Sequence, residues 1–229
     1  MIPRLKPHDP PPGVRDGAVP LGARMEPSKA TAQTVVTYWF GDDRSADPRA
    51  IADLYNPRWF GADAETDADI RHRFAPLRER ALNGELLAWT HDPLERLALI
   101  LLVDQFSRNL FRNDRRAFHH DRLALDWAQS GIALGMDQAL RPLERVFFYL
   151  PLEHSEHLDD QIECVDLMRR LIDEVPSDQR PLFENFADYA QRHLDIIERF
   201  SRFPHRNAVL DRDSTPAETQ FLRQPGSRF

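Results

Sequence analysis

The chain has 229 residues, a formal net charge of −7 and 41% hydrophobic residues. This length and hydrophobic content are sufficient for one large globular domain with a sizeable core. The acidic balance argues against electrostatic binding of nucleic acid, which requires a surplus of basic residues. The longest apolar run, Leu97 to Val103, is far shorter than the roughly 20 residues that span a bilayer.

The N-terminal 29 residues have a composition unlike the rest of the chain. They hold seven of the 18 prolines and no periodic apolar pattern, so they cannot bury enough surface to offset chain entropy. We expect residues 1–29 to be a disordered extension and residues 30–229 to be a single all-helical domain. The start of the chain lacks the apolar segment of a secretory signal, and Met25 is a candidate start of translation.

The single cysteine, Cys164, excludes an intramolecular disulfide and a cysteine-based zinc cluster. It lies between apolar residues, which favours a small core residue over a catalytic thiol. A chain without disulfides is typical of a reducing compartment, so the sequence predicts a cytoplasmic protein.

From Thr31 onward the apolar residues recur at helical period, and no long stretch alternates at period two. The predicted helices cover residues 31–40, 65–82, 92–112, 115–129, 141–150, 156–174, 181–200 and 216–222. Asp92 before Pro93, Asp114, and Thr215 before Pro216 are typical helix starts. Gly84 and Gly131 are predicted to end helices, and Pro76 is predicted to kink or split one.

The fold class predicted from this pattern is all-α. Amphipathic helices need partners, and short connections favour antiparallel neighbours, so the helices should pair into hairpins. Two arrangements are compatible with this pairing: a compact bundle and a superhelix of the tetratricopeptide kind. No 34-residue repeat can be aligned, so the sequence does not decide between them.

A first cluster of polar residues follows the apolar run Leu97 to Val103 on the same predicted helix. It consists of Asp104, Gln105, Arg108 and Asn109. Burial of such groups costs several kcal/mol unless they are paired. They therefore form an internal ion pair between Asp104 and Arg108, cap neighbouring helices, or line a wet cavity.

Two further polar clusters each adjoin an apolar segment. Glu153, His154 and Glu156 follow the aromatic stretch "FFYLPL", and His205, Arg206 and Asn207 follow Pro204 at the end of a long helix. Three polar clusters that each adjoin an apolar segment are unusual on a protein surface. They could instead form one internal site at the ends of several helices. We therefore take these residues and those of the first cluster as candidate ligand-binding residues.

The chemistry of these clusters suggests roles for individual residues. Arg108 and Arg206 could donate two hydrogen bonds each to a carboxylate or a phosphate. Glu153 and His154 are the candidate catalytic residues, because a carboxyl group and an imidazole beside apolar residues can have shifted pKa values. Complete metal motifs are absent, so we expect no metal. Without a Gly-rich phosphate loop, we expect no cofactor.

Two "WFG" triplets, Trp39 to Gly41 and Trp59 to Gly61, suggest aromatic packing followed by a glycine that ends a helix. The alternative for these triplets is that one of the indoles forms a wall of the polar site.

Four ordered motifs resemble the bacterial family known as domain of unknown function 924. They are "YWFG", "LILLVDQFSRNLFR", "FYLPLEHSEHLDDQ" and "RFSRFPHRNAVLDRDSTPAE". The resemblance covers about Thr31 to Leu222 and implies a tetratricopeptide-like helical fold with no established activity. The family's recurring positions fall on the three polar clusters. Ser201 and Asp211 stand where the family usually has glycine, which restricts a positive φ at these positions.

Three functional hypotheses remain open from the sequence. In the first, the clusters form a pocket for a small anionic ligand, with or without catalysis. In the second, the protein is an interaction module that holds a peptide in a groove between helical hairpins. In the third, the clusters are an internal hydrogen-bond network that fixes how the helices pack. Binding of nucleic acid or of a membrane is not expected, and the oligomeric state is left open.

Overall fold

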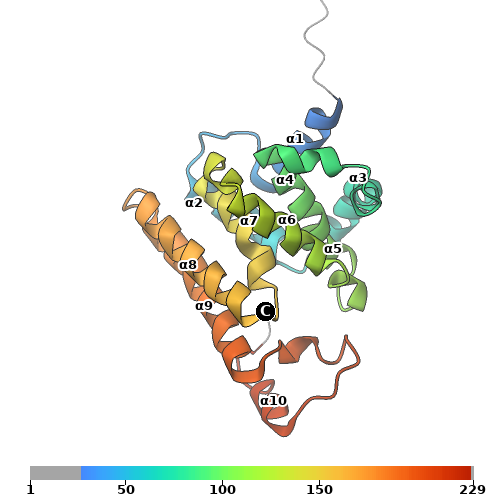
Figure 1. The fold of residues 1–229 in the computed structure, drawn as a ribbon, viewed down its shortest axis with the longest axis vertical. Helices are drawn as coiled ribbons and strands as arrows, with labels where there is room; N and C mark the ends of the chain where they lie inside the picture. The colour runs from blue at the N-terminus through green and yellow to red at the C-terminus, as the bar shows by residue number, and fades with distance from the viewer. Residues whose placement is uncertain (1–26, 228–229) are drawn as a thin grey trace, which may run out of the picture.

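The computed structural model describes residues 27–227, and its regular structure over this range is entirely helical (Figure 1). The predicted all-α class is therefore confirmed. The α-helices are α1 (Pro27–Phe40), α2 (Pro48–Phe60), α3 (Ala64–Leu82), α4 (Pro93–Ile100), α5 (Phe106–Leu110), α6 (Asp121–Ala133), α7 (Pro142–Glu153), α8 (Leu158–Glu174), α9 (Arg180–Phe200) and α10 (Pro216–Phe221). Short segments connect them: the 3-10 turns η1 (Leu87–His91), η3 (Arg115–Ala117), η4 (Met136–Ala139) and η5 (Pro204–Arg206), and the π-helical turn η2 (Leu101–Gln105).

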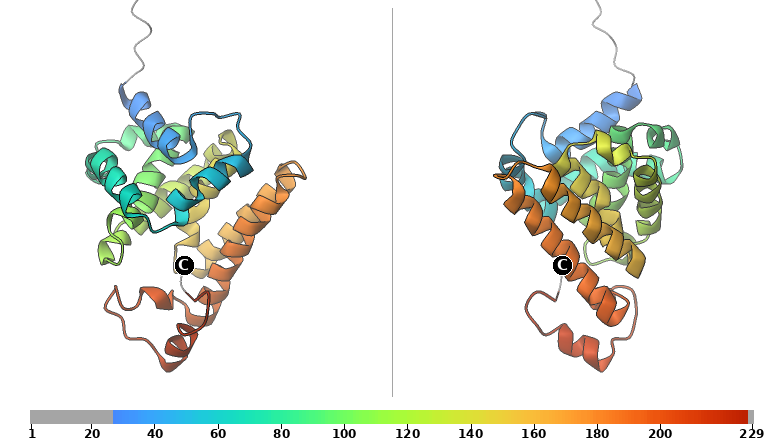
Figure 2. Two further views of the ribbon diagram at one scale, coloured as in Figure 1. Left: turned by 180° about the vertical axis from the view of Figure 1, so that it is seen from behind. Right: turned by 60° about the vertical axis from the view of Figure 1, so that its left-hand side comes forward.

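The helices α1 to α7 gather into a bundle, and α8 and α9 form a long antiparallel hairpin along one side (Figures 1 and 2). The hairpin is attached mainly through α7, which contacts both α8 and α9. After α9 the chain turns back beneath the bundle and carries the short helix α10 (Figure 1). A helical bundle thus describes the fold, whereas the superhelical arrangement of tetratricopeptide repeats is not confirmed.

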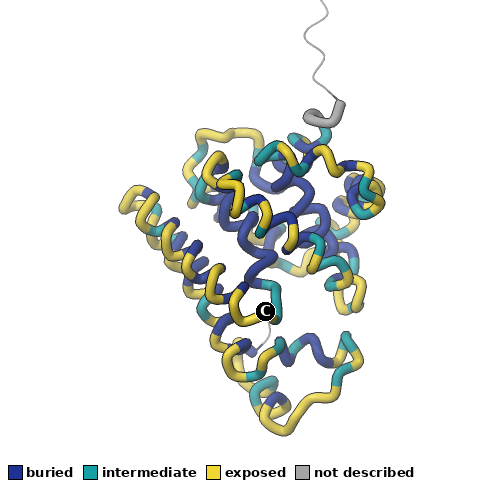
Figure 3. Tube along the Cα trace, in the orientation of Figure 1, coloured by how far each residue is buried: buried dark blue, intermediate teal, exposed yellow. Residues whose placement is uncertain are grey.

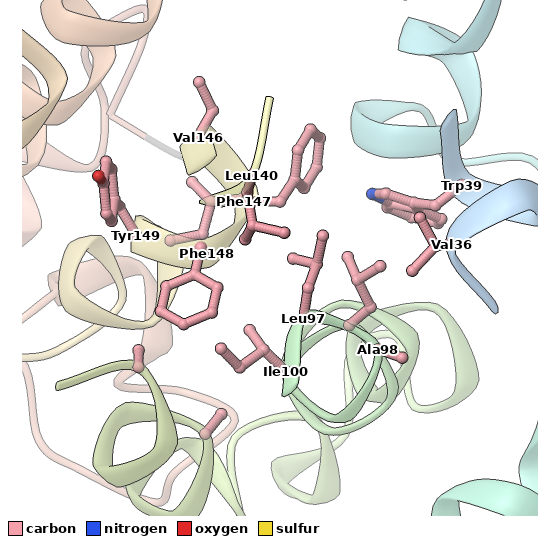
Figure 4. Packing of buried hydrophobic residues seen from close by; sticks show 14 of the residues in the cluster. Val36, Trp39, Leu97, Ala98, Ile100, Leu140, Val146, Phe147, Phe148 and Tyr149 are labelled. Atoms are coloured by element: carbon pink, nitrogen blue, oxygen red, sulfur yellow. The ribbon is translucent and has the colours of Figure 1, made fainter. Parts of the chain in front are cut away.

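The helix α4 lies at the centre of the bundle and packs on α1, α6 and α7. Every residue from Leu97 to Val103 has no exposed surface, and Figure 3 shows this segment among the buried parts of the chain. Leu97 and Ile100 face the apolar side chains of α1 and α7 (Figure 4). The ring of Phe147 meets Trp39 edge-on, with the centroids 5.9 Å apart. The apolar run is therefore a core helix surrounded by protein, as the sequence predicts.

One helix, α2, was not predicted. It contains Pro57 and has little apolar character, which obscured the helical period. Its start is nevertheless signalled, because the side chain of Asp47 accepts hydrogen bonds from the backbone N–H groups of Arg49 and Ala50, and Pro48 occupies the first turn. This is the same signal that correctly predicted the start of α4 at Asp92.

Several predicted helix ends need correction. Pro76 does not split α3, which runs unbroken from Ala64 to Leu82. Gly131 does not end α6; it lies inside the helix, where a Cβ atom would come within 2.6 Å of Phe148 and 2.8 Å of Arg96. Gly84, by contrast, follows α3 with a φ of +78°, as expected of a glycine that ends a helix.

The "WFG" triplets serve packing. Trp39 and Trp59 are both buried, and Nε1 of Trp59 donates a hydrogen bond of 2.8 Å to the carbonyl oxygen of Trp39. Gly41 has a φ of +83° just after α1, so the first triplet ends its helix with a left-handed glycine.

The proposed N-terminal extension over residues 1–29 falls almost wholly outside the described residues, as does the candidate start at Met25. Within its last residues, α1 already begins at Pro27.

Candidate functional site

The core helix changes its hydrogen-bonding pattern where it becomes polar. A continuous helix over residues 92–112 was predicted, but Leu101–Gln105 form a π-helical turn, and the N–H group of Phe106 donates to the carbonyl oxygen of Leu101. Such turns widen the helix locally and are frequent at functional sites. Here the turn holds Asp104, which is fully buried, and Gln105 inside the bundle.

The carboxylate of Asp104 is bound from three sides. Nδ1 of His154 lies 2.8 Å from Oδ1, Nε2 of Gln105 donates to Oδ2 at 2.6 Å, and a terminal nitrogen of Arg108 lies 3.0 Å from Oδ1. Burial acts to raise the pKa of Asp104, but the charge of Arg108 and the contact with His154 outweigh it and hold the pKa well below its usual range. Asp104 is therefore ionised in the folded protein.

The imidazole of His154 is neutral in this environment. Burial and the charge of Arg108 lower its pKa, although Asp104 acts in the opposite direction. Because the ionised carboxylate of Asp104 can only accept, Nδ1 must carry the proton and Nε2 the lone pair. The structure thus fixes one tautomer of His154, whose side chain remains 14% exposed.

Arg108 also bonds to α6. Its two terminal nitrogens donate to the two carboxylate oxygens of Asp121, each at 3.1 Å, and one of them also donates to the carbonyl oxygen of Asp104 at 2.8 Å. Burial acts to lower the pKa of Arg108, whereas Asp104 and Asp121 raise it by more. The guanidinium fork that was expected to face a ligand is therefore occupied by carboxylates of the protein.

Glu153, the last residue of α7, is buried near Asp104. Burial and the charge of Asp104 raise its pKa to about 8, so Glu153 is protonated at neutral pH. Its Oε1 lies 3.4 Å from Nδ1 of His193, which also donates to the carbonyl oxygen of Tyr189 at 2.8 Å. Burial lowers the pKa of His193 to about 3, so this imidazole is neutral as well.

Arg206, in η5, closes the cluster from the C-terminal segment. One of its terminal nitrogens donates to the carbonyl oxygen of His154 at 3.0 Å, and its guanidinium lies 4.8 Å from the ring centroid of Phe118 and 4.5 Å from that of Phe203. Burial and the nearby charge of Arg108 lower its pKa to about 10. Its Nε is buried and has no hydrogen-bond partner among residues 27–227.

Six of the predicted residues therefore come together, and we call them, with Asp121 and His193, the Asp104 cluster. The predicted members are Asp104, Gln105, Arg108, Glu153, His154 and Arg206. Their side chains come from η2, α5, the end of α7 with the residue that follows it, and η5, so the expected convergence of three separate stretches is observed for these residues.

The other predicted residues bond elsewhere. Asn109 donates to Asp67 of α3 at 2.9 Å. Glu156 accepts two hydrogen bonds from Arg212, at 2.7 and 2.9 Å, and one from the backbone N–H group of Phe203 at 2.8 Å. This pair anchors the C-terminal segment to the start of α8.

The other two predicted residues, His205 and Asn207, lie on either side of Arg206 in the chain and border the Asp104 cluster. The amide nitrogen of Asn207 donates to the hydroxyl of Ser214 at 3.0 Å, while its oxygen is buried without a hydrogen-bond partner in the described part of the chain. His205 packs beside the ring of Phe203, and burial together with the charge of Arg206 lowers its pKa to about 4.

Two members of the Asp104 cluster, Asp121 and His193, were not predicted. Asp121 looks like an ordinary first-turn acid of α6, and no local pattern distinguishes it. His193 did give a signal, because it lies on the apolar stripe of α9, between Ala190 and Leu194, where a polar residue is unexpected.

Two cavities lie elsewhere on the protein. One of about 320 Å³ is bordered by α8 and the end of α6, and one of about 620 Å³ lies between α1, α2 and α3. The Asp104 cluster itself reaches the surface at Arg108, whose side chain is 21% exposed, and at His154. Over residues 27–227, no group of three or more His, Cys, Asp or Glu side chains is arranged to hold a metal ion. None of the helices in this range has the length and apolar character needed to cross a membrane.

Fold and site together define an all-helical bundle with a buried cluster of ionised and neutral titratable groups at the end of its central helix. The chain belongs to the family described as bacterial protein of unknown function (DUF924), whose model matches residues 35–226. It is similar to a solved structure of a protein of unknown function from Agrobacterium tumefaciens, with 36% sequence identity and a TM-score of 0.70. The similarity covers 85% of this chain and 98% of that one. No curated protein matches the sequence significantly.

Proposed function

We propose that the Asp104 cluster binds a small monoanionic carboxylate. The observation that carries this proposal is Arg206, whose Nε–H group is buried without a hydrogen-bond partner in the described residues although its guanidinium lies close to the rings of Phe118 and Phe203. An unsatisfied buried donor of this kind costs about 1–3 kcal/mol. A ligand oxygen that accepts from Nε would remove this cost.

The charges of the cluster disfavour a doubly charged ligand more than a singly charged one. Arg108 and Arg206 are balanced by Asp104 and Asp121, whereas Glu153 and the histidines are neutral. A dianion such as phosphate would bring two uncompensated charges into a buried site, which is costly. Of the two ligand types expected from the sequence, a carboxylate and a phosphate, we therefore propose a carboxylate.

The neighbouring groups could also act on the ligand by acid and base chemistry. His154 presents a lone pair on Nε2 while Asp104 holds its other nitrogen, the arrangement of an oriented general base. Glu153 is protonated and could donate a proton or a hydrogen bond. These are the roles expected of the two candidate catalytic residues, and they allow the site either to bind the carboxylate or to transform it.

The competing hypothesis is an internal network whose only role is to fix the packing of η5 and α7 on the central helix. Most donors of the cluster are indeed paired, which this hypothesis requires. The protein-interaction alternative has less support, because most residues of the cluster are buried rather than spread along a groove. We propose a cytoplasmic location for the protein, because a chain with Cys164 as its single cysteine and no intramolecular disulfide is typical of a reducing compartment.

Thermal shift with formate, acetate, propionate and inorganic phosphate tests the proposal. We expect one or more of the monocarboxylates to raise the Tm of the wild type, and phosphate to raise it less. Arg206→Lys keeps the charge but removes the Nε–H group, so it should lose the response. Arg112→Lys is the matched control, because Arg112 pairs with Asp67 outside the cluster. Equal responses of the wild type and Arg206→Lys would favour the internal network.

A further inference from the structure

A second polar site lies between the three N-terminal helices, which the left-hand view of Figure 2 shows in blue to teal. It is the cavity of about 620 Å³, and its lining includes Gln33, Thr37, Tyr38, Arg58, Asp69 and Arg73. The cavity is open to solvent and is large enough to hold a small molecule. The cavity shares no residue with the Asp104 cluster.

Two arginines of the cavity are held against the same aromatic ring. The guanidinium carbon of Arg58 lies 4.2 Å from the ring centroid of Tyr38, and that of Arg73 lies 4.6 Å from it. A stacked guanidinium keeps its N–H groups free around its edge for an oxyanion. Tyr38 therefore holds both guanidiniums around its ring, and all three side chains line the cavity.

The positive charge of these arginines is only partly neutralised. Arg73 lies 3.5 Å from Asp69, but both side chains are nearly half exposed, so this pair is weak. Burial, followed by the contact with Asp69, raises the pKa of Tyr38 to about 12, so the phenol adds no negative charge. Two arginines and one aspartate leave the cavity with a net positive charge.

Arg58 carries the uncompensated part of this charge. One of its terminal nitrogens donates to the backbone carbonyl of Tyr38, but Arg58 forms no ion pair with a carboxylate in the described part of the chain. Its Nε is buried and has no hydrogen-bond partner within residues 27–227. A guanidinium without a carboxylate partner beside a positively charged cavity points to an anionic ligand.

We propose that this cavity binds the phosphate group of a small phosphorylated molecule. The terminal oxygens of a phosphate group can accept from guanidinium N–H groups in more than one direction, and the charge of the phosphate is opposite to the net charge of the cavity. The remaining volume is bordered by Gln33, whose amide nitrogen donates to the hydroxyl of Thr37 at 3.1 Å. This polar wall suits a hydroxylated body of the ligand. The site is independent of the carboxylate site proposed above.

Titration of protein labelled with ¹⁵N-arginine by glycerol 3-phosphate tests this inference, with Arg58→Lys used to assign the Nε–H signal of Arg58. We expect that signal to shift saturably with glycerol 3-phosphate, and less with glycerol or acetate at the same concentration. Arg58→Gln and Arg73→Gln should each weaken binding roughly tenfold or more. The ion pair of Arg73 with Asp69 is exposed, so the Arg73 variant remains informative if Arg58→Gln misfolds.

Two control variants distinguish binding in this cavity from a general loss of positive charge and from binding at the Asp104 cluster. Arg49→Gln removes the same charge from an exposed position of α2 and should bind as the wild type does. Arg206→Lys should also leave this titration unchanged, because it alters only the carboxylate site. Absence of a saturable shift, equal binding of glycerol or acetate, or wild-type affinity in both glutamine variants would overturn the inference.

Discussion

Asp104 and His154, fifty residues apart in the chain, are joined by a hydrogen bond of 2.8 Å between Oδ1 and Nδ1. The bond ties the π-helical turn η2 to the residue that follows α7. It also fixes the protonation of both groups, because an ionised carboxylate can only accept. The contact thus links the packing of the bundle to the chemistry of the candidate site.

Asp104→Asn should destabilise the protein strongly. The substitution keeps the shape of the side chain but leaves Arg108 with Asp121 as its only carboxylate partner. Loss of one member of a buried ion pair costs about 3–5 kcal/mol, and we expect a loss in the lower part of that range in urea denaturation, because Arg108 retains Asp121. Asp126→Asn is the matched control, since Asp126 forms an i,i+4 pair with Arg122 on the surface. The control should lose less than about 1 kcal/mol, and equal losses would contradict the burial of the Asp104 charge.

Glu153 should make the protein less stable as the pH rises above neutrality. The folded protein keeps the Glu153 proton up to a pKa of about 8, whereas the unfolded chain releases it near 4.5. The folded state therefore holds more protons between these values, so stability falls with rising pH by up to about 1.4 kcal/mol per unit. The buried histidines have lowered pKa values and act in the opposite direction, mainly below their ordinary value of 6.5, and their effect is the same in the wild type and in Glu153→Gln.

The window from pH 7 to 8 therefore isolates Glu153. In urea denaturation, the wild type should lose about 1 kcal/mol relative to Glu153→Gln across this window. An equal change in stability for the two proteins would mean that Glu153 is ionised in the folded protein.

Ser201→Gly and Asp211→Gly should each stabilise the protein. Both residues have a φ of +54°, a left-handed conformation that glycine adopts without strain. The relief of strain exceeds the added entropy of the unfolded chain, so we expect a gain of about 0.5–1 kcal/mol for each. Ala187→Gly, within α9, should lose about 1 kcal/mol. A loss in the first two variants would show that their side chains make contacts worth more than the strain.

Gly131→Ala should destabilise the protein although alanine favours helices. The added Cβ would lie 2.6 Å from the ring of Phe148 and 2.8 Å from Cδ of Arg96, so both side chains must move. Overpacking of this kind costs about 1–3 kcal/mol, which exceeds the gain in helix propensity of about 1 kcal/mol. Thermal denaturation should show a lower Tm, and a raised Tm would mean that α6 and α7 can separate at this point without cost.

The sequence predicted the fold class and most helices because their apolar stripes and caps are local signals. It missed α2, where Pro57 and polar residues mask the period, and it could not foresee the π-helical turn, which depends on the packing of Asp104. Because burial of unpaired polar groups is costly, the sequence also predicted that the three polar stretches of the Asp104 cluster lie close together. The cost of burial does not determine which partner each group finds, so Asn109 and Glu156 were included although they bond elsewhere, and Asp121 and His193 were omitted.

The ¹⁵N spectrum of the His154 imidazole, recorded at pH 7 with and without acetate, tests the carboxylate site most directly. We predict a neutral ring with the proton on Nδ1 and a bare Nε2 whose signal shifts saturably with acetate in the wild type but not in Arg206→Lys. A ring protonated on Nε2, or an Nε2 signal that acetate leaves unchanged, would contradict the assignment of the Asp104 cluster as a ligand site.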